Sequence, residues 1–464
     1  MPVNTKNNKK LFGTSGIRGK IGEEVTSNLA LNVAKALATY LGGTGNVVLG
    51  YDTRTTNKML DNAITAGLLE SGVNVLKIGM VPTPLVGYAV KTLNADAGIM
   101  ITASHNPSQY NGIKIWNSNG MAYTPSQERE IENIYYSKEF KEASWDNIGT
   151  IYHDKEIKQK YINNLLSIVD IKPGLKVVID CASGAGSELS PLIFRMAGCE
   201  VVTVNSQIDG FFPGRNPEPN EANLGDLMKV VIATGADLGI AHDGDADRMI
   251  AIDENGRVGD FDKLLAIISG YMAEKYGKND LKVITTVDAG ICLDESLDHV
   301  NGNIIRTKVG DVNVAESIIE ENAIFGGEPS GTWLHPDFCM CPDGILSGLR
   351  MAEIVSKKGY LSKLLDNIPN YSNIREKINC SKEDKIKVME NMEKLLTTSF
   401  DDVVDVNTID GVRLTFSDDS WVLVRPSGTE DYIRVTLEAK TIENANLIRD
   451  VSVKIIKDNL NYKK

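Results

Sequence analysis

The chain has 464 residues, more than one hydrophobic core can serve, and at roughly 150 residues per domain about three units are expected. Hydrophobic residues make up 42% and charged residues 24% of the sequence, a balance that excludes an intrinsically disordered chain. The formal net charge of -13 opposes a polyanion, so we expect no nucleic-acid partner, and a local cluster of cations would have to hold any anionic ligand.

Targeting and redox signals indicate a cytoplasmic protein. The polar, basic N-terminal segment leads into Gly13 rather than into the apolar core of a secretory signal. The longest apolar run, Leu264 to Ala273, is about half of the roughly 20 residues that a membrane helix needs, so we expect no membrane partner. The six cysteines lack C-x-x-C pairs, and Cys339 with Cys341 is too weak a signal for zinc.

The first part of the chain alternates helical and strand patterns. Apolar residues from Leu29 to Leu41 recur at helical spacing behind Thr26, and Gly42-Gly43 ends the pattern. A buried strand is expected at 47–51. Further along, the pattern predicts a helix over 56–71 and a strand over 73–78. This alternation predicts a βαβ unit with a parallel sheet.

The same alternation returns twice before the pattern changes. The second unit, beginning near residue 154, has predicted strands at 176–180 and 200–204; the third has a helix at 261–276 and strands at 282–285 and 323–325. Beyond Tyr371, predicted helices at 382–396 and 442–456 flank three alternating stretches within 412–437. This last unit indicates an α+β domain. Charged connections near 141–154 and 367–373 are the predicted linkers.

Three carboxylates converge in the run Asp243-Gly244-Asp245-Ala246-Asp247-Arg248. The run follows an apolar strand, and alternate residues of an extended chain point the same way. Two carboxylates about 4 Å apart repel by about 4 kcal/mol at an effective dielectric constant of about 20, and a divalent cation removes that cost. The alternatives are a solvated turn and a calcium loop, but the flanking helices of a calcium loop are absent. Asp243, Asp245 and Asp247 are therefore predicted ligands of magnesium, which is favoured over calcium.

Ser104 lies where the strand 98–103 ends, in Thr102-Ala103-Ser104-His105-Asn106-Pro107. Ligands of parallel α/β units bind outside the carboxyl ends of strands, so Ser104 is a candidate catalytic residue. Taken alone it would be interpreted as a turn cap, but a second strand end with three acids favours catalysis. The glycines of a hydrolase nucleophile elbow are missing around it.

His105 and Lys114 are neighbours of this serine. Adjacency in sequence makes His105 an awkward base for Ser104, so we expect a phosphate-contacting or structural histidine. Lys114 can turn its ammonium into the same site, although a surface lysine fits its sequence pattern equally well.

Two later loops have the chemistry of sugar and phosphate ligands. Gly327 to Thr332 offers one carboxylate and two hydroxyls for a sugar, with a capped turn as the alternative. Arg425 to Glu430 combines a guanidinium, two hydroxyls and an accessible glycine amide, which suits a phosphate. It is not a Walker A loop, and a surface turn is the alternative.

Taken together, these loops resemble those of the alpha-D-phosphohexomutase family. The matching segments lie in the family's order along nearly the whole chain: Gly13-Thr14-Ser15-Gly16-Ile17-Arg18-Gly19, the Ser104 segment, the Asp243 run, the Glu328 loop and the Arg425 loop. Segments 11–16, 326–333 and 425–430 are most similar to archaeal-type phosphoglucosamine mutases. The resemblance implies an α/β fold of four domains around a central cleft, with three similar α/β domains of mixed sheets and a C-terminal α+β domain.

The resemblance also implies the domain bounds. Domain I would span 1–153 with the phosphoserine loop, and domain II 154–252 with the metal-binding loop. Domain III would span 253–368 with the sugar-binding loop, and domain IV 369–464 with the phosphate-binding loop.

Residue roles follow from the same resemblance. Ser104 would be modified to phosphoserine and join Asp243, Asp245 and Asp247 on one Mg²⁺ ion per subunit. Arg18, Lys114 and Arg248 would be catalytic residues around the transferred phosphoryl group. The expected substrate-binding residues are His105, Glu328, Ser330, Arg425, Ser427, Gly428 and Thr429.

The implied reaction is the reversible conversion of glucosamine 6-phosphate to glucosamine 1-phosphate. A hexose 1,6-bisphosphate would serve as intermediate or primer, so the expected partner is a phosphosugar, and a homodimer is kept open. The alternatives are a phosphomannomutase or phosphoglucomutase, a metal-dependent sugar phosphatase, and a non-catalytic sugar-phosphate binding protein.

Two positions depart from the family pattern. Many members have a histidine where this chain has Thr332, so we expect Lys114 to take the acid or base role, with His335 as a weaker substitute. Asp431 stands where many members of the family have a proline, so the stiffness of the Arg425 loop is expected to differ from theirs. Nothing in the Glu328 loop demands an amine over a hydroxyl, so the preference for an amino sugar rests on the resemblance.

Overall fold

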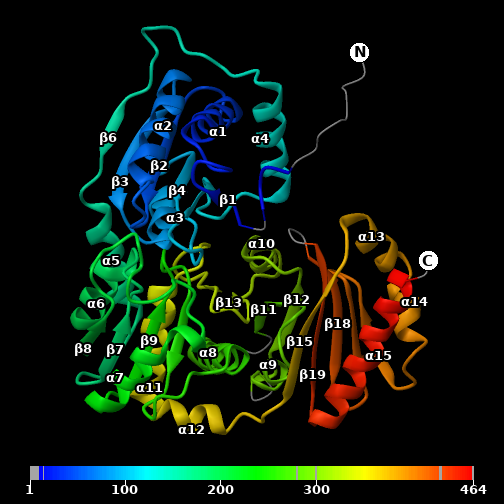
Figure 1. Ribbon diagram of the computed structural model, residues 1–464. Helices are drawn as coiled ribbons and strands as arrows, with labels where there is room; N and C mark the ends of the chain where they lie inside the picture. Colours follow the sequence, from blue (N-terminus) through cyan, green and yellow to red (C-terminus); the bar gives the residue numbers. More distant parts are fainter. Residues whose placement is uncertain (1–9, 14, 278–280, 298–299, 428–430, 462–464) are drawn as a thin grey trace. The chain divides into compact units, whose positions relative to one another are not determined.

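The computed structural model describes residues 10–13, 15–277, 281–297, 300–427 and 431–461. The chain divides into two compact units, which Figure 1 draws coloured along the sequence. The first unit is Met1–Asp260 with Ser330–Leu364, and the second is Phe261–Pro329 with Leu365–Lys464.

The first unit contains two mixed sheets and their covering helices. Its strands are β1 (Ile17–Lys20), β2 (Asn46–Tyr51), β3 (Asn74–Met80), β4 (Ala97–Ile101), β5 (Tyr110–Asn117), β6 (Ile151–His153), β7 (Lys176–Asp180), β8 (Glu200–Val204), β9 (Leu238–His242), β10 (Met249–Ile252) and β14 (Trp333–Leu334). Its helices are α1 (Ser27–Tyr40), α2 (Asn57–Glu70), α3 (Thr83–Thr92), α4 (Pro125–Ser137), α5 (Ile157–Ile168), α6 (Gly186–Met196), η1 (Glu221–Asn223), α7 (Gly225–Thr234) and α11 (Gly344–Lys358). The short helix α12 (Leu361–Asp366) contains the boundary between the units.

The first sheet has the strand order β1-β5-β4-β2-β3-β6. β4, β2, β3 and β6 are parallel neighbours. The alternating pattern predicted a parallel sheet but not β6, which lies in a predicted linker. β5 runs antiparallel to both β4 and β1, with Ile101 opposite Ile113. The chain between β4 and β5 is therefore the turn of a hairpin, a feature that the sequence analysis missed.

Helices cover both faces of this sheet. One face packs against α1, α2 and α4, and its core includes Val47, Leu49, Ile99 and Ile101. On the other face lies α3, where a Cβ on Gly98 would meet Val90 at 2.5 Å, so the glycine permits the close packing. Val81 N–H donates to Tyr51 O at 3.0 Å. This hydrogen bond holds the segment before α3 at the carboxyl end of β2.

α1 shows how local sequence sets the bounds of an element. Thr26 has extended backbone and its side chain accepts a hydrogen bond from Leu29 N at 3.1 Å, which caps the helix. Gly42 and Gly43 then adopt positive φ angles of 82° and 71°, where a side chain would be strained. The predicted helix between these signals is confirmed.

The second sheet has the order β10-β9-β7-β8. β9, β7 and β8 are parallel, and β10 returns antiparallel to β9 with Met249 opposite His242. α7 packs on one face through the side chains around Gly239, and α11 packs on the other, where Gly348 faces Phe194 and Ile240. The loop that carries the three aspartates is thus also a hairpin turn.

The second unit contains a parallel sheet and an antiparallel one. Its strands are β11 (Lys282–Thr286), β12 (Asn303–Thr307), β13 (Phe325–Gly327), β15 (Ser372–Asn379), β16 (Val403–Asn407), β17 (Val412–Phe416), β18 (Trp421–Pro426) and β19 (Tyr432–Ala439). Its helices are α8 (Phe261–Tyr276), α9 (Cys292–Glu295), α10 (Asp311–Glu321), α13 (Lys382–Glu390), α14 (Met392–Thr397) and α15 (Ile442–Asn461). β11 pairs in parallel with β12 and β13, and the C-terminal sheet has the antiparallel order β15-β19-β18-β17-β16.

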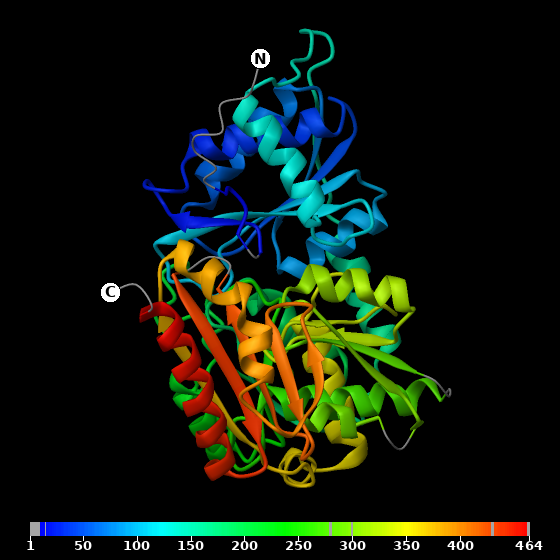
Figure 2. The same ribbon diagram turned by 90° about the vertical axis from the view of Figure 1, so that its right-hand side faces the viewer.

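Both faces of the C-terminal sheet are covered. Val422 and Val424 share a core with α13, α14 and α15, which Figure 2 shows on one side of these strands. Trp421 and Leu423 alternate with these valines and point to the opposite face of the sheet. There they pack with Val287 and Ile291, which follow β11. Three α/β sheets followed by this α+β arrangement confirm the predicted fold class, whereas the four predicted domain bounds stay a prediction.

Several predicted element bounds were wrong. The expected helix over 382–396 is two helices, α13 and α14, which Asn391 separates. The predicted linkers 141–154 and 367–373 contain β6 and the first residues of β15, because pairing with β3 and β19 orders segments without a strong local pattern. The strand expected at 323–325 instead spans Phe325–Gly327. Within the described part of the chain, none of the helices has the length and apolar character of a bilayer-spanning segment.

Candidate active site

Two hairpin turns of the first unit carry the predicted phosphoserine and the predicted metal ligands. Ser104 lies between β4 and β5, and the three aspartates lie between β9 and β10. In each sheet a parallel inner strand runs into an antiparallel one at this point. Both turns therefore stand at the carboxyl ends of parallel strands, where ligands of α/β folds bind.

The two turns touch through their backbones. A Cβ on Gly244 would lie 2.5 Å from Ser104 O, so the contact requires glycine. Thr83, the first residue of α3, donates to Asp245 O through its N–H (2.9 Å) and to Asp245 Oδ2 through its hydroxyl (2.6 Å). Ser104 and Ala246 have φ angles of 49° and 57°, so tertiary contacts hold both turns in a conformation that such residues rarely adopt.

Ser104 points into the group of carboxylates. Its Oγ donates to Asp243 Oδ2 at 2.7 Å, and ligand oxygens of Asp243, Asp245 and Asp247 lie within 4.8 Å of one another. Oδ1 of Asp245 and Oδ1 of Asp247 are buried and have no hydrogen-bond partner among the described residues. Three carboxylates grouped this closely, two of them with buried unpartnered oxygens among the described residues, fit a hard divalent cation such as Mg²⁺.

The electrostatics of the three acids also favour a cation. Burial, followed by the charges of Asp247 and Asp245, raises the pKa of Asp243 well above its usual value. Burial acts in the same direction on Asp245, but the Lys114 ammonium and the Thr83 hydroxyl outweigh it and hold the pKa of Asp245 below its usual value. A bound divalent cation would favour the ionised form of all three.

Lys114 is buried beside these acids rather than exposed. Its Nζ lies 3.0 Å from Asp245 Oδ2 and 2.6 Å from Asp247 Oδ2. Burial lowers the pKa of Lys114, but the charges of Asp245 and Asp247 outweigh burial and raise it above its ordinary value. At neutral pH Lys114 is therefore a cation that can donate a proton but cannot accept one.

His105 lies next to the Ser104 hydroxyl despite being adjacent in sequence. The distance from Ser104 Oγ to His105 Nδ1 is 3.3 Å, and His105 Nε2 lies 3.4 Å from Glu218 Oε2. Burial, followed by the charges of Arg248 and Arg18, lowers the pKa of His105 to about 2, so the imidazole is neutral at pH 7. A neutral ring at this distance can form a hydrogen bond with the serine hydroxyl.

Arg18 of β1 and Arg248 are two further cations near these turns. Arg18 Nη1 donates to Asn106 Oδ1 at 3.4 Å, and its buried Nε has no partner among the described residues. Arg248 Nη1 lies 3.5 Å from Glu218 Oε1. With Lys114 they give the first unit three cations for an anionic group at Ser104.

The residue that replaces the family's histidine lies beside Arg248. Thr332 forms an isolated antiparallel bridge with Arg248, and Ser330 Oγ donates to Thr332 Oγ1 at 3.1 Å. His335, the weaker substitute base of the sequence analysis, is buried with its Nε2 2.9 Å from Ser347 Oγ of α11. This contact ties the His335 ring to α11, which gives the ring a structural role.

The other predicted ligand-binding residues belong to the second unit. Glu328 follows β13, and its Oε1 accepts from Gly310 N at 2.8 Å. Arg425 Nε lies 2.7 Å from Asp410 Oδ2, and Ser427 O accepts from Lys385 Nζ at 3.0 Å. Gly428 and Thr429 lie outside the described residues.

Sequence reasoning missed several polar residues around the turns. Asp52 and Arg54 directly follow the strand β2, so their position at a strand end was a usable signal. Thr83 and Glu218 had no comparable signal, because only the packing of α3 and of the chain before η1 brings them to the acids and to His105.

Known protein families match consecutive parts of the chain. The model described as "Phosphoglucomutase/phosphomannomutase, alpha/beta/alpha domain I" matches residues 9–142. The corresponding models of domain II, domain III and the C-terminal domain match residues 159–256, 260–371 and 377–454.

Individual relatives match over nearly the whole length. A "Probable phosphoglucosamine mutase" of Methanobrevibacter smithii is 71% identical over 97% of this chain and 99% of that protein. A "Phosphoglucosamine mutase" of Methanococcus aeolicus is 49% identical over 98% of this chain and 100% of that protein. The crystal structure of a phosphoglucomutase/phosphomannomutase family protein from Burkholderia thailandensis has a TM-score of 0.88 and 26% identity, with 98% of each chain covered.

Proposed function

The chain belongs to the phosphoglucomutase/phosphomannomutase family, and we propose that it interconverts glucosamine 6-phosphate and glucosamine 1-phosphate through a phosphoserine at Ser104. The observation that carries the proposal is the hydrogen bond from Ser104 Oγ to Asp243 within a buried group of three aspartates. The names of the relatives that are 71% and 49% identical support the amino sugar as substrate.

Asp243, Asp245 and Asp247 would hold Mg²⁺ together with an oxygen of the Ser104 phosphate. When bound, the ion supplies positive charge that offsets the charge of the transferred phosphoryl group. Oδ1 of Asp245 and Oδ1 of Asp247, which have no hydrogen-bond partner in the part of the chain that the structure describes, support this assignment.

In the first half-reaction, the bond between phosphorus and Ser104 Oγ breaks as a bond to the free sugar hydroxyl forms. The hydroxyl loses its proton and Ser104 Oγ gains one, and the product is a sugar bisphosphate. Lys114, Arg18 and Arg248 would neutralise the phosphoryl oxygens, and neutral His105 would form a hydrogen bond with Ser104 Oγ. The transfer has a loose transition state, so alignment and charge carry most of the catalysis.

In the second half-reaction, the other phosphate of the bisphosphate returns to Ser104. The sugar must turn around between the two transfers, so the site must accept either phosphate at the position that is not reacting. Arg425, Ser427, Gly428 and Thr429 have the donors for that role, and Glu328 and Ser330 suit the sugar hydroxyls. In this scheme the hexose 1,6-bisphosphate is both intermediate and primer.

A side-by-side assay tests the substrate. Glucosamine 6-phosphate, glucose 6-phosphate and mannose 6-phosphate are supplied with Mg²⁺ and a trace of glucose 1,6-bisphosphate, and the 1-phosphates are measured. We expect the highest kcat/KM with the amino sugar, and loss of turnover in EDTA that returns with Mg²⁺. A preference for mannose or glucose would favour the second candidate, a phosphomannomutase or phosphoglucomutase, which the family description of the Burkholderia thailandensis protein supports.

The role of Ser104 is tested separately. Ser104→Ala should reduce interconversion of all three sugars by at least about 10⁴-fold, because the phosphoryl carrier is gone. Full interconversion by this variant would overturn the proposal. Release of inorganic phosphate faster than isomer formation by the unaltered protein would indicate a phosphatase instead.

A further inference from the structure

A buried guanidinium lies behind the Ser104 turn and has no part in the chemistry described above. Arg54 follows β2, and its side chain is fully shielded from solvent. Its Nε donates to Asp52 Oδ2 at 3.1 Å. The other four N–H groups donate to four backbone carbonyls of the turn: Pro107 (2.7 Å) and Tyr110 (2.9 Å) from Nη1, and Ser104 (2.9 Å) and Asn106 (2.6 Å) from Nη2. All five donors of the guanidinium are therefore used, and four of them hold this one turn.

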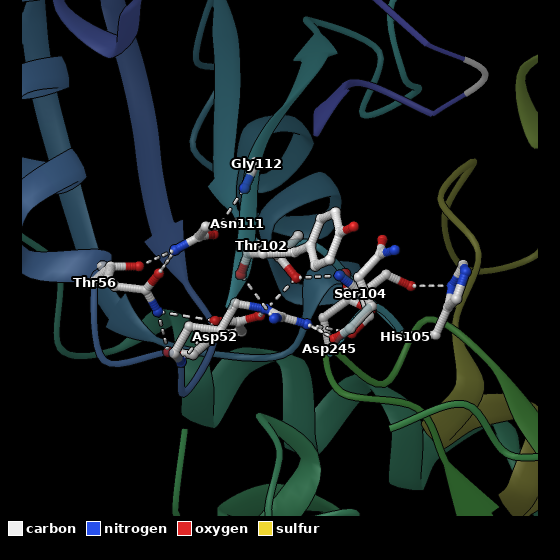
Figure 3. Close-up of polar contacts among 12 residues, drawn as sticks. Asp52, Thr56, Thr102, Ser104, His105, Asn111, Gly112 and Asp245 are labelled. Carbon is white, nitrogen blue, oxygen red and sulfur yellow. Dashed lines mark hydrogen bonds and ion pairs between the residues drawn. The ribbon is translucent and has the colours of Figure 1, made fainter. Parts of the chain in front are cut away.

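The same ion pair also reaches the other side of Ser104. Asp52 Oδ2 accepts from the Thr102 hydroxyl at 2.7 Å, and the oxygen of that hydroxyl accepts from Ser104 N–H at 2.8 Å. Figure 3 shows this chain of contacts from Asp52 through Thr102 to Ser104. Since Arg54 binds Ser104 O, the peptide groups on both sides of the serine are fixed by one Asp–Arg pair.

This double hold explains how Ser104 keeps its unusual backbone. A residue with a side chain at a φ of 49° is strained by on the order of 1 kcal/mol, so a free turn would relax to another conformation. Relaxation would rotate Cβ and move Oγ away from Asp243, which it now contacts at 2.7 Å. The pair thus aims the hydroxyl at the metal ligands.

The loop at 209–212, which follows β8 of the second sheet, covers the Asp52–Arg54 pair. The Phe212 ring stacks with its centroid 5.0 Å from Arg54 Cζ, and a Cβ on Gly210 would lie 2.8 Å from Arg54 Cα. This cover excludes water from Asp52 and Arg54, which strengthens their mutual attraction and rigidifies the turn.

The metal-binding turn is held by the same device. Asp180 ends β7, the strand next to β9, just as Asp52 follows β2, the strand next to β4. Arg215 Nε donates to Asp180 Oδ2 at 2.9 Å, and its Nη2 donates at 2.6 Å to the carbonyl of His242, which directly precedes Asp243. A buried Asp–Arg pair beside each functional turn indicates that the pairs serve those turns.

We propose that Asp52 and Arg54 are positioning residues for the phosphoryl-carrying serine, an inference that rests on the proposed role of Ser104. They touch no substrate atom. Their removal should slow transfer to and from Ser104 while leaving the sugar's binding groups in place, so kcat falls and KM does not.

The test uses Arg54→Lys, which keeps the charge but can form at most three of the five hydrogen bonds. We expect kcat with the best of the three sugar phosphates to fall about 100-fold and KM to change less than about twofold. The rate of Ser104 phosphorylation by glucose 1,6-bisphosphate, followed by intact mass, should fall by the same factor as kcat.

Arg350→Lys is the matched control for destabilisation. Arg350 lies in α11 of the same unit, is equally buried, pairs with Asp337 at 2.6 Å and donates to Ile168 O at 3.0 Å. This control should lower Tm as Arg54→Lys does but keep kcat within about twofold of the unaltered protein. Thr102→Val removes only the hydroxyl between Asp52 and Ser104 N, and should lower kcat about tenfold; it decides the question if Arg54→Lys does not fold.

A kcat loss in Arg54→Lys no larger than in Arg350→Lys, or an unchanged phosphorylation rate, would overturn the inference, as would an unchanged kcat in Thr102→Val. Failure of the proposed phosphoserine chemistry at Ser104 is a different result, because the unaltered protein would then interconvert none of the three sugars.

Discussion

At the scale of single residues, charged side chains around the two turns form ion pairs with one another. Lys114 contacts Asp245 and Asp247, and Glu218 contacts Arg248 and His105. An isolated buried charge costs several kcal/mol, so these ion pairs offset part of the cost of burying the charges. The pairing also means that a cation must compete with the Lys114 ammonium for the same carboxylates.

Lys114→Met should therefore separate metal binding from catalysis. Without the competing ammonium, we expect Mg²⁺ or Mn²⁺ to bind about tenfold more tightly, by titration calorimetry. At the same time kcat should fall at least about 100-fold, because a cation beside the phosphoryl group is lost. Lys229→Met removes an exposed ammonium of α7 and should change neither quantity. Weaker metal binding by Lys114→Met would contradict this account.

Backbone contact between the two turns gives a second prediction. The Cβ of Gly244→Ala would press on Ser104 O, and neither backbone can yield without moving Ser104 or Asp245. We expect a loss of about 1–3 kcal/mol in the free energy of unfolding and a drop in kcat. Gly225→Ala, at an open position of the same unit, is the control and should be neutral within about 0.5 kcal/mol. Urea unfolding and steady-state kinetics measure both.

At the scale of elements, short local signals decide where the supporting helices begin. α1, α4 and α11 start behind side-chain caps at Thr26, Thr124 and Asp343. These helices cover the sheets whose strands end in the two turns. Capping therefore contributes to the site only through the stability of its scaffold.

Thr26→Ala removes the hydroxyl oxygen that accepts from Leu29 N. We expect the free energy of unfolding to fall by about 1 kcal/mol, with kcat and KM unchanged at temperatures well below Tm. Thr26→Ser keeps the oxygen and should recover most of the loss. Equal destabilisation by both variants would show that the methyl group, not the cap, carries the effect.

At the scale of the whole molecule, one buried acid links stability to pH. Asp343 accepts from Leu346 N (2.9 Å) and from the Tyr161 hydroxyl (2.7 Å). Burial raises the pKa of Asp343 to about 6, and these hydrogen bonds offset only part of the rise. In the unfolded chain an aspartic acid titrates near pH 4, so between about pH 4 and pH 6 the folded state binds the extra proton.

The free energy of unfolding should therefore decrease as pH rises through this window, by up to about 3 kcal/mol from Asp343. Asp343→Asn keeps the cap acceptor but cannot ionise, so its stability relative to the unaltered protein should improve from about pH 4 to about pH 6 and then level off. Urea unfolding at several pH values measures the difference, with exposed Asp226→Asn as the control for loss of one charge. A pH-independent difference for Asp343→Asn would refute the assignment.

The sequence by itself determined the α/β alternation, the C-terminal α+β unit and the turns that carry chemistry. Helical spacing behind Thr26 and the acids after the strand ending at His242 are local patterns, which short-range geometry makes readable. The family resemblance added the order of the loops along the chain and the roles expected for them.

Only the tertiary structure decided how the turns are built. β5 and β10 return antiparallel, Lys114 is buried against two aspartates, and Arg54 holds four carbonyls of the Ser104 turn. These facts depend on strand pairing and on contacts between residues far apart in sequence, such as Thr83 with Asp245. No local pattern encodes them, because a lysine within a strand, or an arginine shortly after one, has the same sequence signature whether it is buried or solvated.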